Sequence, residues 1–509
     1  MELLKNKVNQ YTLVSDGVYG QEETLETIVP DVNPDVLRII CASSDICVKE
    51  KSLQTGKVRA TGEVRSRIFY TAEGDSTIWQ VEGVTPFSCT ADVPEAGPDD
   101  TLIAFCEVVN AQASLVNPRK LSVRTRYCLH AQVYRQDTVE FVEGVECAAE
   151  DGVNTLVQTV QPLTLVGLHE RRLAINEEIR ITGGNVLPTD RLYRSEVTWV
   201  TEDQKVLTNK IMLRGSACVR AVILSEKDGS LSQHVYNLPF AQIIESDNTD
   251  AGDEVTVSYL LMQKEIRLTA GADGSAVLQC SLAASAQTFV SRRVSVNVLT
   301  DLYSTAHNCE LETAEVVART GDERQNMTAL ISETVQADYP AVRVVDVAAA
   351  CECRRPTPGD TSAVGWVCFQ VMYETTTGGL CCLNRKIEVE VQLDKAFAKG
   401  TRLHMECNDP QATVVDEGSL CLTGKAVFTC VSPVEQNCRQ VKGCRINKQS
   451  CKTRPRRGTL ILRSYDGHDT IWQIAKKYNT TSADILAANK ITGESELDAG
   501  RLIIIPFSR

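Results

Sequence analysis

The chain has 509 residues, of which 43% are hydrophobic and 23% are charged, so it is neither a wholly disordered nor a collagen-like chain. Its net charge of −13 argues against extensive nucleic-acid binding. No apolar run reaches the roughly 18–20 residues that a bilayer requires, and the first ten residues lack the apolar core of a signal peptide, so a cytoplasmic location is expected.

A repeated pattern organises the first 437 residues. Gly62 and Gly215 each follow a lysine and an aliphatic residue at matching offsets, and Phe87 and Phe240 each follow a proline; the spacing is 153 residues in both cases. Gly365 begins a weaker third match. Because two separate matches share one spacing, the sequence predicts three related domains in tandem, with the third diverged. Their expected bounds are residues 1–150, 151–305 and 306–437.

Strand patterns dominate these three copies. In residues 121–134, a series of apolar or small residues that begins with Leu121 and Val123 alternates with a mostly polar series that includes His130. Residues 387–393 alternate in the same way in the third copy. A period of two is typical of a strand with one buried face, so a mostly β fold of tandem β-sandwich-like domains is predicted. His130 lies on the polar face and is expected to be exposed.

Three features of the copies resemble the SPOCS, or SipL-type, domain that clostridial spore-coat morphogenetic proteins repeat. The first is a proline before the opening aliphatic run. The second is a glycine-led strand that ends in Ile68-Phe69-Tyr70 or Val222-Ile223-Leu224, and the third is a Pro-Phe pair before an acidic loop. The spacing of about 150 residues between the copies makes the resemblance specific.

A basic segment follows the repeats. Residues 438–458 contain no acidic residue, whereas residues 1–437 carry a large acidic excess, so the segment is expected to be a cysteine-containing linker. Its basic residues are Arg439, Lys442, Arg445, Lys448, Lys452, Arg454, Arg456 and Arg457. The chain's twenty cysteines include no C-x-x-C pair, so free thiols and no metal site are expected.

The last 51 residues, 459–509, show a β-α-α-β order. A short strand is followed by a helix at 470–478, capped by Asp469 or Thr470, then by a second helix that stops near Asn489, and finally by a strand at 502–505. A small core is expected to hold this module together as an independently folding unit. The predicted core consists of Ile471, Ile474, Tyr478, Ile485, Leu486, Leu502 and either Ile504 or Ile505.

This module resembles a LysM domain. The family pattern matches at Asp469-Thr470-Ile471-Trp472, at Ile485 with Asn489, and at Leu497 with Gly500. The family's glycine before Asp-Thr is His468 here, and Gly467 stands one position earlier, in a turn that helps to line the family's N-acetylglucosamine groove. The resemblance places a partner- or glycan-binding surface at Asp466, Gly467, Asp469, Thr470, Ile471, Trp472, Ala488, Asn489, Lys490 and Ile491.

Trp472 has two interpretations. It lies at the edge of the apolar stripe of its helix, where it could seal the margin of the core. It could also anchor a protein partner, because tryptophan is over-represented among interface residues that dominate binding.

Catalytic motifs are missing from the sequence. It contains no G-x-x-x-x-G-K-[ST], H-E-x-x-H or G-x-S-x-G, and its six histidines are scattered, so neither an enzyme nor a cofactor is expected. The resemblance implies a scaffold that helps to place the spore coat on the forespore from the mother-cell cytoplasm. Its implied partners are the stage IV sporulation protein A-type coat ATPase, which LysM would dock, and other coat proteins. A lipid-linked precursor is a further ligand that LysM could meet from the mother cell during engulfment. The alternative is a cell-wall protein whose LysM binds peptidoglycan or N-acetylglucosamine glycan.

Overall fold

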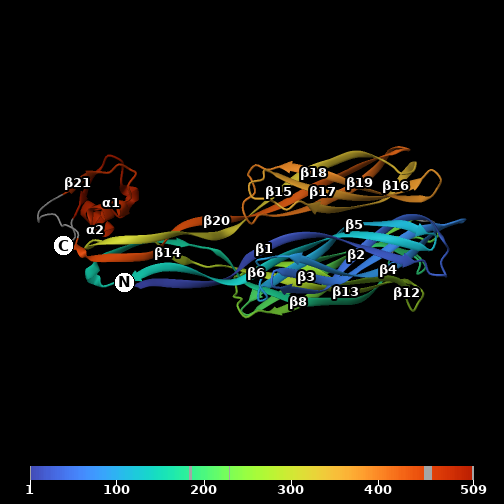
Figure 1. Cartoon of the computed structure of the whole chain (residues 1–509), viewed down its shortest axis with the longest axis horizontal. Helices are drawn as coiled ribbons and strands as arrows, with labels where there is room; N and C mark the ends of the chain where they lie inside the picture. Colours follow the sequence, from blue (N-terminus) through green and yellow to red (C-terminus); the bar gives the residue numbers. More distant parts are fainter. Residues whose placement is uncertain (1, 183–185, 228–229, 452–460, 507–509) are drawn as a thin grey trace.

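The computed structural model describes residues 2–182, 186–227, 230–451 and 461–506. Strands dominate these residues, and the two α-helices among them both lie in the C-terminal module, so the predicted mostly β fold is confirmed. The molecule is elongated: a head of three β-sandwiches continues into a narrow stalk, and the C-terminal domain lies at the far end of the stalk (Figure 1).

Each repeat contains two three-stranded sheets with the same connectivity. The sheets of the first repeat are β1-β6-β5 and β2-β3-β4, those of the second are β8-β13-β12 and β9-β10-β11, and those of the third are β15-β20-β19 and β16-β17-β18. All of these neighbours are antiparallel. The first repeat comprises β1 (Glu2–Ile28), β2 (Val36–Gln54), β3 (Lys57–Ala72), β4 (Asp75–Asp92), β5 (Thr101–Asn117) and β6 (Lys120–Glu146).

The other two repeats follow in the same order. The second comprises β8 (Leu163–Arg180), β9 (Arg191–Leu207), β10 (Lys210–Leu224), β11 (Leu231–Glu245), β12 (Glu254–Ala270) and β13 (Ala276–Arg293). The third comprises β15 (His307–Gln336), β16 (Ala341–Cys353), β17 (Ser362–Thr375), β18 (Leu380–Gln392), β19 (Arg402–Asp416) and β20 (Ser419–Cys451).

The alternation in residues 121–134 explains how the sandwich of the first repeat closes. On β6 the side chains of Leu121, Val123, Tyr127, Leu129 and Val133 are all buried, as their period of two predicts. Those from Tyr127 onward pack against apolar residues of β2, β3 and β4, which form the opposite sheet. The hydrophobic core of each repeat therefore lies between its two sheets.

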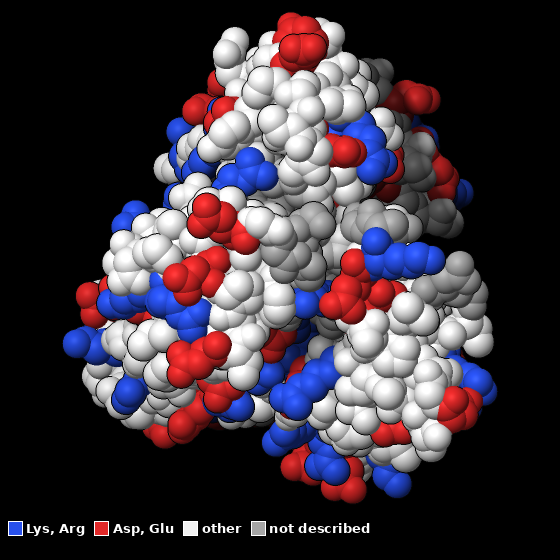
Figure 2. Space-filling model, turned by 90° about the vertical axis from the view of Figure 1, so that its right-hand side faces the viewer, with Lys and Arg blue, Asp and Glu red and all other residues white. Residues whose placement is uncertain are grey.

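The three repeats also share a core with one another. Phe69, Val222 and Met372 occupy equivalent positions, each seven residues after the matched glycine, and all three are buried in a single cluster. Figure 2 looks along the long axis onto the head and shows three lobes arranged around a common centre. The head is therefore one packed body with contacts between all three repeats.

Long ribbons leave the head and form the stalk. The stalk consists of the outer ends of the β1–β6 and β15–β20 ribbons and of a third ribbon, in which β7 (Val153–Val160) pairs with β14 (Val296–Ser304). A 3₁₀ turn at Ala149–Asp151 precedes β7. Two apolar clusters with members from all three ribbons fill its interior. Their buried residues are Val8, Phe141, Val142, Val160, Val296, Val298, Leu299, Leu302, Cys438 and Val441.

The prediction of a linker at residues 438–458 is wrong for residues 438–451, which belong to a strand. Strand β20 continues to Cys451, and it pairs with β15 along the stalk. Cys438 and Val441 are buried in the stalk, while Arg439, Lys442 and Arg445 are exposed on the same strand. The basic residues are therefore the solvent-facing side of a strand, and residues 452–458 lie outside the described residues.

The expected exposure of His130 is also wrong. Its ring stacks on Phe105 with 4.2 Å between centroids, and its Nε2 lies 2.7 Å from Oε1 of Glu107. A cavity of about 20 Å³ beside it is lined by Cys351 and His404 of the third repeat. Around His130, the polar face of β6 is thus covered by the third repeat, a contact that a periodic pattern within one strand does not encode.

The C-terminal domain has the predicted element order. It comprises β21 (Ile461–Ser464), α1 (Ile471–Tyr478), α2 (Ser482–Asn489), a 3₁₀ turn at Glu494–Glu496 and β22 (Leu502–Ile505), with β21 and β22 antiparallel. Ile471, Ile474 and Ile485 are buried as predicted. The expected burial of Leu502 is wrong by one residue: Ile503 and Ile505 face the core, and the strand's period of two leaves Leu502 63% exposed.

Candidate functional site

The turn between β21 and α1 is built around the Asp466 carboxylate. Its Oδ1 accepts hydrogen bonds from the backbone N–H groups of Asp469 and His468, each at 3.0 Å, and these bonds lower the pKa of Asp466 because they favour its charged form. Gly467 has φ of +78°, a left-handed conformation that glycine adopts without steric cost. The turn therefore requires its glycine one position before His468, which accounts for the departure from the LysM pattern.

Thr470 is the residue that caps α1. Its hydroxyl accepts a hydrogen bond from the Gln473 N–H at 3.2 Å, and the Gln473 side chain accepts one from the Thr470 N–H at 2.8 Å. Asp469, the other candidate for the cap, forms an ion pair with Arg463 instead. The N–H of Ile471 donates to the Glu494 carboxylate, which ties the segment before β22 to the start of the helix.

The second group of candidate residues lies at the end of α2. The Asn489 side chain donates to the Ile504 carbonyl at 2.7 Å and accepts from the Ile504 N–H at 2.7 Å, so it joins α2 to β22. Lys490, with φ of +54°, caps the helix one residue later than the sequence predicted. Ala488 is half-buried and Ile491 is buried, which leaves Lys490 as the exposed member of this group.

The candidate residues of the turn and the start of α1, 466–471, lie close to residues that the sequence did not single out. The Tyr465 carbonyl accepts a hydrogen bond from the Gly500 N–H at 2.8 Å, and a Cβ on Gly467 would be 3.4 Å from the Cβ of Ala499. Residues 466–471 thus lie beside Glu494 and the segment at Ala499. Gly500 belonged to the sequence motif, but Glu494 and Ala499 carried no signal.

Trp472 faces the stalk of its own chain. Its indole Nε1 donates a hydrogen bond to Oδ2 of Asp301 on β14 at 2.8 Å, and its ring meets Tyr303 edge-on with 4.8 Å between centroids. Lys476, one turn further along α1, donates to both oxygens of the same carboxylate at 2.6 and 2.8 Å. Trp472 is therefore half-buried against the apolar core of its own domain and also contacts β14 of the same chain.

Tyr303 completes this contact from the stalk side. Its hydroxyl donates to the Thr480 carbonyl at 2.7 Å, and the side chain, 2% exposed, belongs to the apolar core of the C-terminal domain. Burial raises the pKa of Tyr303 to about 12, so it stays protonated and keeps its donor at neutral pH. No sequence signal marked Asp301 or Tyr303, because both precede the domain that they contact by more than 150 residues.

Comparisons with known families identify two parts of the chain. The family described as SipL, SPOCS domain, matches residues 35–116, which span β2 to β5 of the first repeat, and the LysM domain family matches residues 468–506. No curated protein and no solved structure matches the chain. The chain therefore combines a SipL-type SPOCS domain with a C-terminal LysM domain, as the sequence analysis identified.

These two domains are non-catalytic binding domains, and they indicate a sporulation-related protein with a peptidoglycan-binding type of module. Within the described ranges, no group of three or more His, Cys, Asp or Glu side chains is placed to hold a metal ion. No helix among the described residues has the length and apolar character needed to cross a membrane.

Proposed function

We propose that the chain is a non-enzymatic scaffold of spore-coat morphogenesis that acts at the forespore surface from the mother-cell cytoplasm. Its LysM domain docks the stage IV sporulation protein A-type coat ATPase, and its β-repeats recruit other coat proteins. The observation that carries the proposal is the presence of a SipL-type SPOCS domain and a LysM domain in one chain. The stalk holds the LysM domain away from the head, so two partners can be engaged at opposite ends (Figure 1).

The LysM surface favours a protein partner over a sugar. At the turn that lines the family's glycan groove, an exposed His468 replaces the family glycine. The most prominent aromatic side chain of α1, Trp472, already forms a protein contact. Tryptophan and paired charges are typical of protein interfaces. The alternative function is binding of peptidoglycan or N-acetylglucosamine at a cell wall, and the LysM family match favours it.

Localisation in sporulating cells tests the proposal. A fluorescent fusion of the full chain is expected to form a ring around the forespore and to be absent from growing cells. The same fusion truncated after Cys451, which lacks LysM but keeps the head and stalk strands, is expected to lose most of the ring. A signal on the outer wall of vegetative cells would contradict the scaffold function and support the wall-binding alternative.

A further inference from the structure

The contact between LysM and the stalk has a specific chemistry. On the LysM side it consists of the Trp472 indole, the Lys476 ammonium group and the Thr480 carbonyl. On the stalk side, within the part of the chain that the structure describes, Asp301 and Tyr303 make these contacts. One carboxylate thus accepts hydrogen bonds from both α1 residues, while one phenol donates to the LysM backbone and packs against the indole.

The local structure of β14 presents these two side chains together. A register shift between Leu299 and Asp301 leaves Thr300 as an extra residue, and such a bulge redirects the side chains that follow it. Leu302 is then buried in the stalk, whereas Asp301 and Tyr303, two residues apart on an extended strand, share the side that faces LysM. The LysM face therefore recognises a short extended segment of the form acid-x-aromatic.

The contact involves few side chains of β14, so a segment of another protein can replace β14 on LysM. Asp301 and Lys476 keep 24% and 40% of their side-chain surface exposed, so water reaches the ion pair. The remaining contacts of the joint come from Tyr303, which is buried in the apolar core of LysM, meets the Trp472 ring edge-on and donates to the Thr480 carbonyl. Such a joint is populated largely because both halves belong to one chain and have a high effective concentration. A free partner with the same chemistry and further contacts would displace β14.

We propose that the α1 face of LysM around Trp472 and Lys476 is its protein-docking surface, which β14 occupies in the free chain. The partner that displaces β14 is a protein that presents an exposed extended segment with an acidic residue followed two positions later by an aromatic one. This inference rests on the proposed function of LysM as a docking domain. It adds the surface, the recognition chemistry and an autoinhibitory contact that limits docking.

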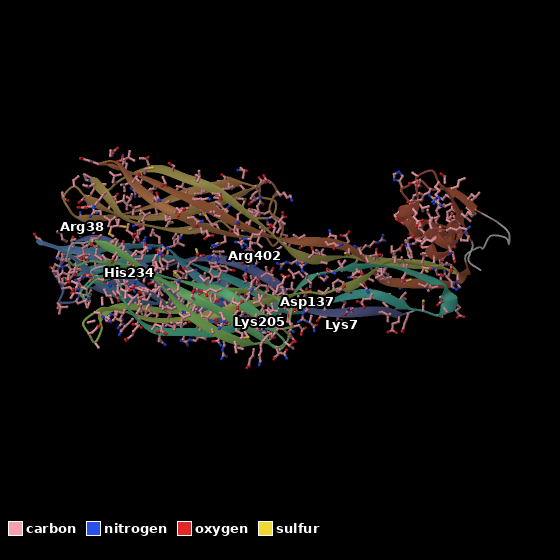
Figure 3. All side chains as sticks on the ribbon, turned by 180° about the vertical axis from the view of Figure 1, so that it is seen from behind. Lys7, Arg38, Asp137, Lys205, His234 and Arg402 are labelled. Carbon is pink, nitrogen blue, oxygen red and sulfur yellow. The ribbon has the colours of Figure 1, made fainter. Side chains whose placement is uncertain are left out.

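A peptide competition with the full chain tests the surface directly. The probe is a labelled peptide with the sequence of residues 298–305, Val-Leu-Thr-Asp-Leu-Tyr-Ser-Thr. Asp301→Ala, which removes the stalk carboxylate without touching LysM, is expected to bind the peptide at least tenfold more tightly than the unchanged chain. Adding Trp472→Ala to that variant is expected to abolish the gain. Asp137→Ala is the matched control, because Asp137 is an exposed acid on the β1–β6 ribbon (Figure 3).

Equal peptide binding by the Asp301→Ala chain and the unchanged chain would overturn the inference. Tyr303→Phe gives a second route to a weakened joint, because it removes the hydrogen bond to Thr480 and keeps the ring in the LysM core, and far-UV circular dichroism shows whether either variant keeps its fold. The purified coat ATPase separates the two proposals. If it binds the unchanged and Asp301→Ala chains equally well, it uses another face, so the inference fails while the proposed function stands. If it binds neither chain, the proposed partner is wrong, and the peptide result alone decides the surface.

Discussion

Gly215→Ala is expected to destabilise the head by about 3 kcal/mol or more, because the added methyl group has no space. A Cβ at this position would overlap the Val200 carbonyl oxygen of β9 and would lie 2.8 Å from the Phe240 ring on β11. A register shift at Arg214/Gly215 brings the β9 backbone close at this point. The overlap is with backbone, so relief requires a strand to move. Urea denaturation, followed by tryptophan fluorescence, measures the loss.

Substitutions at two further glycines provide comparisons for the loss of stability in Gly215→Ala. Gly321→Ala is the control, since no atom lies within 4 Å of its Cβ position and the change is expected to cost less than about 1 kcal/mol. Gly365→Ala is expected to be intermediate, because the nearest neighbour there is the flexible Met405 side chain. A Gly215→Ala chain as stable as the Gly321→Ala chain would show that the close approach of β9 does not exist in solution.

Asp45→Ala is expected to cost about 3–5 kcal/mol, because it leaves the buried Lys264 ammonium group without its counter-charge, whereas Arg67 keeps its ion pair with Glu82. Oδ1 of Asp45 on β2 accepts a hydrogen bond from Lys264 on β12 at 2.6 Å, and Oδ2 lies 3.7 Å from Arg67 on β3. The side chains of Lys264 and Arg67 are only 4% and 5% exposed. This ion pair crosses from the first repeat to the second, so its loss weakens the junction of the head.

A double variant and a surface pair provide the controls for Asp45→Ala. Adding Lys264→Met is expected to recover part of the lost stability, since the unpaired ammonium group is then gone. Glu140→Gln, which breaks the exposed ion pair with Lys5 at 2.9 Å, is expected to change stability by less than about 1 kcal/mol. If Asp45→Ala and Glu140→Gln had equal urea midpoints, the Asp45 site would be solvated and the packed junction between repeats would be refuted.

The repeats could be recognised in the sequence because the matched glycines and the matched phenylalanines belong to one structural feature of each repeat. Gly62 pairs across strands with Phe87, and Gly215 pairs with Phe240, so each conspicuous phenylalanine covers a glycine on the neighbouring strand. The glycine match and the phenylalanine match, both with a spacing of 153 residues, are therefore the two members of one cross-strand pair. Period-two burial on β6 follows from the pleat of a strand, and it was predictable for the same reason.

The contacts between repeats were not predictable from local pattern. His130 was assigned to the solvent because alternation identifies one buried face and gives no information on whether another repeat covers the second. The basic residues of 439–445 were assigned to a linker because composition records charge, whereas the buried Cys438 and Val441 on the same strand determine its structure.

The candidate site was predictable in its local geometry only. Asp466, Gly467 and Thr470 form a turn and a helix cap, and their hydrogen-bond partners lie within a few residues of them in the sequence. The partner of Trp472 is Asp301, which lies 171 residues earlier in the chain. Such a contact depends on where the end of the stalk lies relative to LysM. The helix and strand preferences of neighbouring residues carry no information on that position.

The most direct test of the account is equilibrium binding of the purified full chain to the stage IV sporulation protein A-type coat ATPase, measured beside binding to an N-acetylglucosamine oligomer. The scaffold function predicts saturable binding to the ATPase that Trp472→Ala weakens about thirtyfold, since an interface tryptophan typically contributes 2 kcal/mol or more. Binding to the oligomer should be weak and insensitive to Trp472→Ala. Tight binding to the oligomer, with none to the ATPase, would contradict the account and establish the wall-binding alternative.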